Sequence, residues 1–268
     1  MTLEGLDISI LGPAMVAGLI VLSTHVPLGR QVLARGIIFI DLAIAQIAAL
    51  GVIAAQYAGI DEHGFGVQVA AAVAALAGAG LLAWTDRRWP KMQEPLIGTL
   101  FVLAATGGLL LLANNPQGGE HLKDLLVGQI LWVSFRQLIP AAVLSVALLA
   151  FLWLRRGQLA GLVFYALFAL AITASVQLVG VYLVFASLIV PALATARMPA
   201  RRQLVAAYAI GIAGYVSGLL LSAVFDLPSG AMIVWTLAGC ALLAQLLQKK
   251  RPRVIHRGPQ CQLNSTTL

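Results

Sequence analysis

The chain of 268 residues is 60% hydrophobic and only 10% charged, and its mean hydropathy is +0.94. Because so few polar side chains cannot cover the surface of a 28.1 kDa globule, the composition excludes an ordinary soluble domain. The formal net charge of +7 is dispersed in small groups, which argues against a nucleic-acid-binding surface, and two cysteines, Cys240 and Cys261, do not make a disulfide framework.

The basic residues fall in five clusters on alternate connections between long apolar segments. Of the 17 Lys and Arg, only Lys123 and Arg136 lie elsewhere, and acidic residues such as Asp61 and Asp226 occupy the intervening connections. Short cytoplasmic loops of membrane proteins retain Lys and Arg, so this pattern predicts a polytopic membrane protein whose basic connections are cytoplasmic. The clusters are Arg30/Arg35, Arg87/Arg88/Lys91, Arg155/Arg156, Arg197/Arg201/Arg202 and Lys249/Lys250/Arg251/Arg253/Arg257.

A helix that crosses about 30 Å of hydrocarbon needs roughly 20 apolar residues. Nine crossings would place the first residues outside and the C-terminus in the cytoplasm. The expected fold class is therefore an all-α, polytopic transmembrane helix bundle of about eight or nine spans. The predicted spans are 8–27, 37–57, 66–84, 96–114, 137–155, 158–178, 181–197, 203–224 and 230–247.

Two parts of this topology stay open. The chain is apolar for about forty residues between positions 157 and 196, where only Gln177 and Gly180 indicate a turn, so this turn is expected to be re-entrant or half-buried. A short interfacial helix is predicted at 125–133, with Trp132 as a headgroup anchor. Counts of eight or ten spans are the alternatives.

Polar groups inside membrane spans are costly and tend to be functional. Asp41 and Gln46 lie in the second span, about 140° apart around the helix. In one interpretation Gln46 lines a translocation path and Asp41 gates its inner end. In the other, Asp41 pairs with an arginine such as Arg35, and Gln46 bonds to a neighbouring helix. Gln177 is the third candidate for the path.

Two outer connections combine carboxylate and imidazole groups, a donor set that suits zinc or manganese. Acidic loops with a histidine are also common as ordinary solvated surface, and both interpretations stay open. His25, inside the first span, is interpreted as a locally hydrogen-bonded residue. The weak metal candidates are Asp61, Glu62 and His63 in one connection, and Glu120 and His121, followed by Asp124, in the other.

The sequence contains no Walker A, HExxH, nucleophile-elbow or CxxC motif. The chain is therefore not expected to be an enzyme, and neither catalytic residues nor a cofactor of its own are predicted. If it belongs to a pump, a separate ATPase must supply the energy.

Four stretches, in order, resemble the permease subunits of ATP-binding cassette (ABC) importers for zinc, manganese and related divalent ions. The patterns DLPSG and LVG…IVPA…TAR are the more specific parts of the resemblance. The stretches are GRQVLARGIIFIDLAIAQIAALG (29–51), EPLIGTLFVLAATGGLLLL (94–112), LKDLLVGQILWVS (122–134), and VQLVGVYLVFASLIVPALATAR (176–197) together with FDLPSGAMIV (225–234).

The resemblance implies a transmembrane permease domain over 1–248, and the polar, aperiodic sequence of 249–268 predicts a disordered cytoplasmic tail. It implies a homodimer in the bacterial inner membrane, two cytoplasmic ATP-binding subunits that use the ATP, and a periplasmic metal-binding protein that delivers a divalent ion as cargo. Transport would then follow alternating access. Facing the ATPase or anionic lipid headgroups would be Arg87, Arg88, Arg197, Arg201 and Arg202.

The sequence departs from this family in two places. The family motif DALSH places an Asp and a His one turn apart in the second span, whereas an ungapped alignment gives Leu42 and Gln46 here, with Asp41 one residue out of register. The family also has a coupling helix after the fifth span, but Arg155-Arg156-Gly157 leaves little room for it. Coupling would then use the connection at 86–94 or the one at 197–202.

Two alternatives follow from these departures. Gln46 in place of a histidine favours a permease for a metal chelate, because an organic ligand tolerates neutral hydrogen-bonding walls. The short connection after the fifth span favours a secondary carrier that works without ATP.

Overall fold

The computed structural model describes residues 8–60, 65–112, 126, 128, 130–155 and 161–249, apart from the side chains of Ile8, Arg201, Gln248 and Lys249. Within these residues all regular structure is helical, which confirms the all-α prediction. The helices are α1 (Ile8–Arg35), α2 (Ile40–Tyr57), α3 (Phe65–Arg88), α4 (Gln93–Leu112), α6 (Phe135–Leu154), α7 (Gly161–Val179), α8 (Val181–Thr195), α9 (Ala200–Phe225) and α10 (Ser229–Lys249), with the 3-10 helices η2 (Pro90–Met92) and η3 (Ile130–Trp132).

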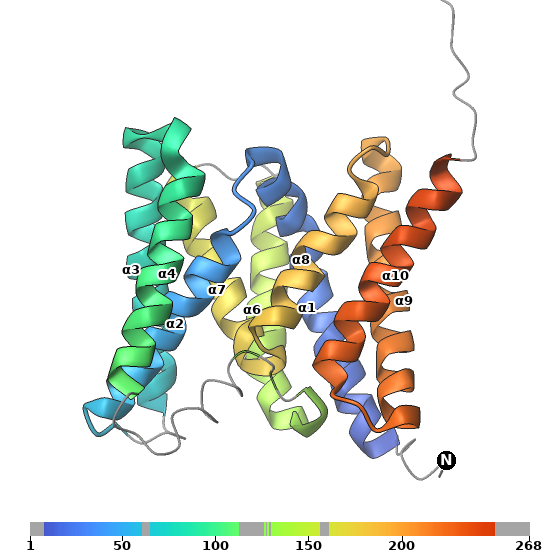
Figure 1. Cartoon of the computed structure of the whole chain (residues 1–268), viewed down its shortest axis with the longest axis horizontal. Coiled ribbons are helices and arrows are strands. Elements are labelled where there is room, and N and C mark those ends of the chain that lie inside the picture. The colour runs from blue at the N-terminus through green and yellow to red at the C-terminus, as the bar shows by residue number, and fades with distance from the viewer. Residues whose placement is uncertain are drawn as a thin grey trace, which may run out of the picture.

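Eight of the described helices are long and apolar enough to cross a bilayer, and α8, with 15 residues, is the short ninth. They run up and down between two ends of the molecule (Figure 1). The basic end, at the top of Figure 1, holds the C-terminal ends of α1, α3 and α8, with Arg35, Arg88 and Arg197. The opposite end holds the end of α2, the start of α3 and the α9–α10 connection. The charge sorting in the sequence therefore corresponds to two ends of one bundle.

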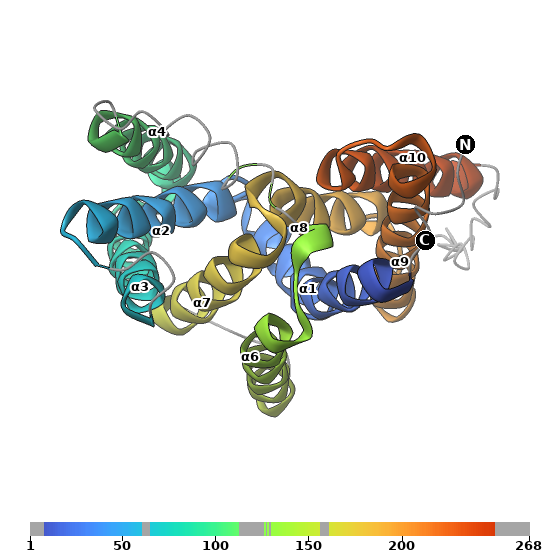
Figure 2. The same cartoon turned by 90° about the horizontal axis from the view of Figure 1, so that it is seen from below.

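The helices form two groups that meet at the centre of the molecule (Figure 2). In one group α2 packs against α3 and α4, and α3 packs against α7, whereas in the other α8, α9 and α10 pack together with α1. The two groups are joined by α8, which contacts α2 and α7, and α6 lies to one side, against α1 and α7. The shared core consists of side chains from both groups.

The expected turn in the long apolar stretch lies at Gly180. This glycine is buried and separates α7 from α8 with φ 81°, a conformation that residues with a Cβ rarely adopt. Its carbonyl oxygen accepts the first hydrogen bond of α8, from the N–H of Val184. The break is therefore enclosed by protein, as irregular backbone at membrane depth must be.

Two predicted boundaries differ from the structure. The first span continues to Arg35 instead of ending near position 27, because α1 accommodates Pro27 inside the helix. At about 1.5 Å per residue the 28 residues of α1 extend roughly 42 Å, beyond a hydrocarbon core of about 30 Å. Of the helix predicted at 125–133, the described residues form mainly the three-residue η3, where Trp132 is 82% exposed.

A polar network connects α3, α4 and α7 near the basic end. The Gln93 amide donates to the carbonyl oxygen of Leu82 at 2.9 Å and to the hydroxyl of Tyr165 at 3.1 Å. The hydroxyl of Thr85 donates to Oε1 of Gln93 at 3.0 Å. Because these groups are buried, their mutual hydrogen bonds fix the start of α4 against its neighbours.

Candidate functional site

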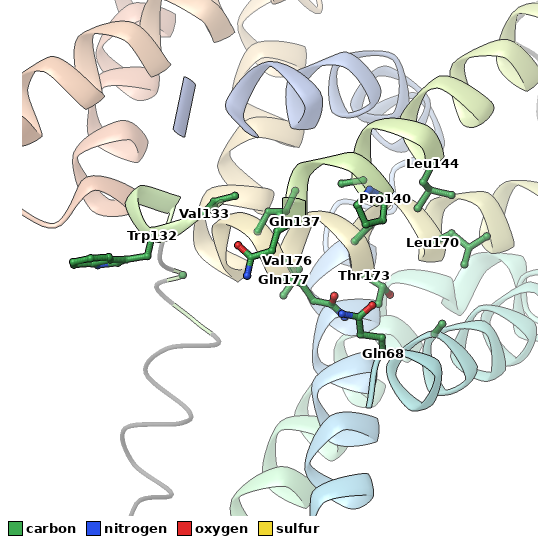
Figure 3. A pocket seen from close by; sticks show the side chains of 15 residues that line it. Gln68, Trp132, Val133, Gln137, Pro140, Leu144, Leu170, Thr173, Val176 and Gln177 are labelled. Carbon is green, nitrogen blue, oxygen red and sulfur yellow. The ribbon is translucent and has the colours of Figure 1, made fainter. Parts of the chain in front are cut away.

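A pocket of about 590 Å³ lies between α3, α6 and α7. Gln68 in the first turn of α3, Gln137 in the first turn of α6 and Gln177 near the end of α7 all line it, so it lies near the opposite end. The side chains of Gln68 and Gln177 point toward each other across the pocket (Figure 3). Three helices therefore bring three side-chain amides to one cavity.

Two of the polar lining residues have a hydrogen-bonding group that is available to a ligand. Oε1 of Gln137 accepts the backbone N–H of Ser134 at 2.9 Å, which caps α6 and leaves the amide nitrogen as the group available to a ligand. The hydroxyl of Thr173, which is 6% exposed, has no hydrogen-bond partner among the described residues. A buried hydroxyl without a partner is costly, so a water molecule or a ligand is expected there.

The pocket walls are otherwise neutral and largely apolar. Among the described residues that line it none carries an ionisable side chain, and Leu144, Leu170 and Trp132 contribute apolar surface. Such walls can hold a hydrated ion or an oxygen-rich organic molecule. They do not supply the charged ligands that compensate the dehydration of a bare divalent ion.

The structure separates the three predicted path residues. Gln177 lines the pocket, whereas Asp41 and Gln46 are 1% and 7% exposed within α2. Since α2 is surrounded by α3, α4, α7 and α8, both side chains lie inside a single chain and not on its surface. The lining of this pocket includes neither Asp41 nor Gln46, so a path through all three residues would have to extend beyond it.

The predicted metal candidates Asp61, Glu62, His63, Glu120 and His121 lie outside the described residues. Within the described part of the chain, no three His, Cys, Asp or Glu side chains are grouped so that they could hold a metal ion. Nδ1 of His25 lies 2.9 Å from the carbonyl oxygen of Val21, which agrees with its interpretation as a locally bonded residue.

The arginines predicted to face the ATPase lie at the basic end. Arg87, Arg88, Arg197 and Arg202 are exposed there, and Arg201 is on the first turn of α9. The α6–α7 connection runs only from Leu154 to Gly161. The α3–α4 connection contains η2, the short helix that the described residues place at this end.

Sequence reasoning missed Gln68, Gln137, Thr173 and Glu94. The first three had no distinguishing pattern, because only the packing of α3, α6 and α7 brings them together. Glu94 was visible as an acid that follows a basic cluster, in the first turn of α4. Its Oε1 accepts the backbone N–H of Phe39, at the start of α2, at 3.4 Å.

The helix lengths, the sorted charges and the neutral pocket define a polytopic α-helical membrane protein. The family model described as "ABC 3 transport family" matches residues 7–164 and 156–248, so this chain belongs to that family. This confirms the family that the sequence motifs indicated, and with it a role in transport.

Similar proteins match along nearly their whole length. The chain is 28% identical to the "Probable iron transport system membrane protein" of Haemophilus influenzae, over 94% of this chain and 98% of that protein. It is 26% identical to the "Manganese transport system membrane protein MntC" of Halalkalibacterium halodurans, over 92% of this chain and 90% of that protein. The solved structure "PsaBC from Streptococcus pneumoniae in complex with Fab" has the same fold, with a TM-score of 0.72, 20% identity and coverage of 93% and 99%.

Proposed function

We propose that this chain is the membrane-spanning permease subunit of an ATP-driven importer for a divalent metal ion. The observation that carries the proposal is the family match over residues 7–248, together with near-full-length relatives named for iron and manganese transport. These relatives favour manganese or iron over zinc as the cargo. The chain itself catalyses no reaction.

The proposed assembly has two copies of the chain in a bacterial inner membrane. Cytoplasmic ATP-binding subunits contact the basic end, where the α3–α4 connection, with η2 and the exposed Arg87 and Arg88, and the separate α8–α9 connection offer docking surfaces. A periplasmic metal-binding protein delivers the cargo to the opposite end. This orientation follows from the Lys and Arg clusters, which place the basic end in the cytoplasm.

Within the chain, the pocket that contains Gln177 forms part of the delivery side of the path. Polar groups at membrane depth need water or protein around them, and three converging amides meet this need in a water-filled cavity. Gln46 and Asp41 belong to the inner part of the path, which this conformation keeps closed. Exchange of substrate between the two parts then requires the conformational switch that ATP drives.

Uptake by cells tests the proposal. Radioactive manganese, iron and zinc are supplied to cells with and without the chain, in each case with the ATP-binding subunit intact or inactivated. Loss of uptake of one ion on removing either component is the expected result. Uptake of all three ions independent of the chain would contradict the proposal, and uptake that needs the chain but not the ATPase would indicate a secondary carrier.

A permease for a metal chelate is the second candidate. The neutral pocket favours it, because amide N–H groups such as that of Gln137 can donate to the oxygens of an organic chelator. Ferric citrate and free Mn²⁺, supplied in parallel to the same cells, distinguish the two candidates. Chain-dependent uptake of iron only as its citrate complex would select the chelate.

A further inference from the structure

A second pocket, of about 720 Å³, lies at the basic end of the bundle, where α1, α6 and α8 end and α9 begins. Among the described residues no acidic side chain lines it. The pocket therefore combines positive charge with apolar walls. Its polar lining comes from Arg30, Gln31 and Gln203, and its apolar lining includes Leu33, Leu152 and Leu204.

The guanidinium of Arg30 has no counter-ion within the described part of the chain. Arg30 is half-buried, and no hydrogen bond or ion pair joins its side chain to another described group. Arg197 and Arg202, which are exposed and adjoin lining residues of the pocket in the sequence, add charge of the same sign. A partly buried cation without an acceptor is costly, so an anion is expected to bind against it.

The start of α9 adds a weaker attraction for an anion. Its N-cap, Pro199, makes no side-chain hydrogen bond, and no acidic residue lies in its first turn. Uncapped N–H groups at a helix start carry partial positive charge and can bond to an anion, and Gln203 places this helix start beside the pocket. The adjacent end of α8 has the opposite partial charge, so the guanidinium of Arg30 remains the principal attraction.

The pocket lies at the depth of lipid headgroups. At about 1.5 Å per residue, Arg30 lies roughly 33 Å along α1 from Ile8, just beyond a hydrocarbon core of about 30 Å. Trp153 and Val205, which directly follow lining residues of α6 and α9, are 80% and 70% exposed. Exposed apolar side chains beside the pocket favour lipid over a water-soluble protein as its occupant, and tryptophan is typical of the headgroup region.

We propose that this pocket binds the phosphate of an anionic phospholipid from the cytoplasmic leaflet. The guanidinium of Arg30 pairs with the phosphate, and the side-chain amides of Gln31 and Gln203 can donate to its oxygens. Basic pockets between membrane helices on the cytoplasmic side bind anionic headgroups in other membrane proteins. The inference needs only the pocket and the cytoplasmic orientation of the basic end, so it does not rest on the identity of the cargo.

Native mass spectrometry of the purified full chain tests this site. The protein is titrated in detergent with phosphatidylglycerol and with phosphatidylcholine of the same acyl chains, and inorganic phosphate is added as a competitor. Arg30→Gln removes the charge but keeps a hydrogen-bond donor. Arg88→Gln is the matched control, since Arg88 is exposed at the same end but lies on α3, outside the pocket.

We expect wild-type protein and Arg88→Gln to bind phosphatidylglycerol at least about fivefold more tightly than phosphatidylcholine, and Arg30→Gln to lose this preference, because one arginine near an anionic membrane surface contributes about that factor. Equal binding of phosphatidylglycerol by all three proteins would overturn the proposal. Displacement of the lipid by inorganic phosphate would also overturn it and assign the pocket to a free phosphate. If Arg30→Gln instead keeps the lipid but loses the ATP-binding subunit on purification, the pocket is a protein-docking surface.

A second measurement uses the wild-type chain alone, so it does not depend on variants that fold. Phosphatidylglycerol with a photoactivatable diazirine in its acyl chain is cross-linked to the protein in membranes, and the labelled peptides are identified by mass spectrometry. We expect labelling of the peptides that contain Leu33, Leu152 and Leu204, and less labelling by the phosphatidylcholine analogue. Equal labelling by the two lipids, or none in these peptides, would contradict the proposal. Neither measurement involves metal uptake, so failure of the proposed function is distinguishable from failure of this site.

Discussion

The hydroxyl of Tyr215 on α9 lies 2.8 Å from the hydroxyl of Ser187 on α8, and both side chains are completely buried. Since Ser187 donates its own proton to the carbonyl oxygen of Leu183 at 2.6 Å, the phenol of Tyr215 is the donor to Ser187. This short chain of hydrogen bonds links α9 to the shortest membrane helix. It gives α8 a specific attachment where apolar packing alone would allow sliding.

We predict that Tyr215→Phe destabilises the protein by about 0.5–1.5 kcal/mol, because Ser187 loses its donor while the ring still fills the same space. The melting temperature of the purified protein in detergent measures the effect. Tyr182→Phe is the control, since Tyr182 is 55% exposed, and we expect it to leave the melting temperature unchanged. Equal losses in the two variants would contradict a specific role of the Tyr215 hydroxyl.

Two glycines of α1 predict opposite outcomes for the same substitution. A Cβ added to Gly29 would overlap the carbonyl oxygen of Leu188 on α8, whereas one added to Gly12 has no neighbouring atom within 4 Å. We expect Gly29→Ala to destabilise the protein by about 1–3 kcal/mol through overpacking, and Gly12→Ala to be neutral or to stabilise it by up to about 1 kcal/mol. Melting temperatures of both variants decide this, and similar values would show that α1 and α8 are farther apart.

Replacing a side-chain amide of the pocket is expected to reduce metal uptake in part. We expect Gln68→Leu and Gln177→Leu each to lower metal uptake roughly twofold to tenfold, because each removes about one hydrogen bond to the substrate or to its bound water. Gln245→Leu, an exposed change on α10, provides the matched control. The measurement is initial uptake at equal amounts of membrane-inserted protein. Uptake as fast as wild type in both pocket variants would remove the pocket from the path.

The two ends of the bundle predict different accessibility from outside the cell. With Cys240 and Cys261 replaced by Ser, we expect a membrane-impermeant maleimide to label Asp226→Cys in intact cells, and Arg202→Cys only after permeabilisation. The reason is the retention of Lys and Arg on the cytoplasmic side. The reverse labelling pattern would invert the orientation and exclude delivery of cargo at the Asp226 end.

The helices were predictable from the sequence because apolar length and charge sorting are local properties. Even the turn at Gly180 could be predicted from the sequence, because a single glycine interrupts a long apolar stretch there. The end of α1 was not predictable in the same way, since Arg30 and Arg35 resemble a loop although the helix continues past Pro27 to Arg35. A basic helix end that projects from the membrane has the same composition as a basic connection.

The candidate site was less predictable, because it depends on which helices are neighbours. Gln177 was identified by its polarity alone, but its partners Gln68 and Gln137 come from two other helices. The sequence also gave no sign that Glu94, 53 positions after Asp41, accepts the backbone N–H of Phe39 at the start of α2, a contact that exists only because α2 and α4 pack together. Periodicity gives the depth and face of a residue, but not the helix opposite it.

The 15-residue α8 determines whether the number of membrane crossings is odd or even. A count restricted to helices long enough to cross a bilayer gives eight among the described residues, and an even number would return the chain to the side on which it started. The additional passage through α8 instead leaves the start of α1 and the end of α10 at opposite ends of the bundle (Figure 1). A reporter enzyme that requires disulfide bonds would therefore be active when fused before α1 and inactive when fused after α10.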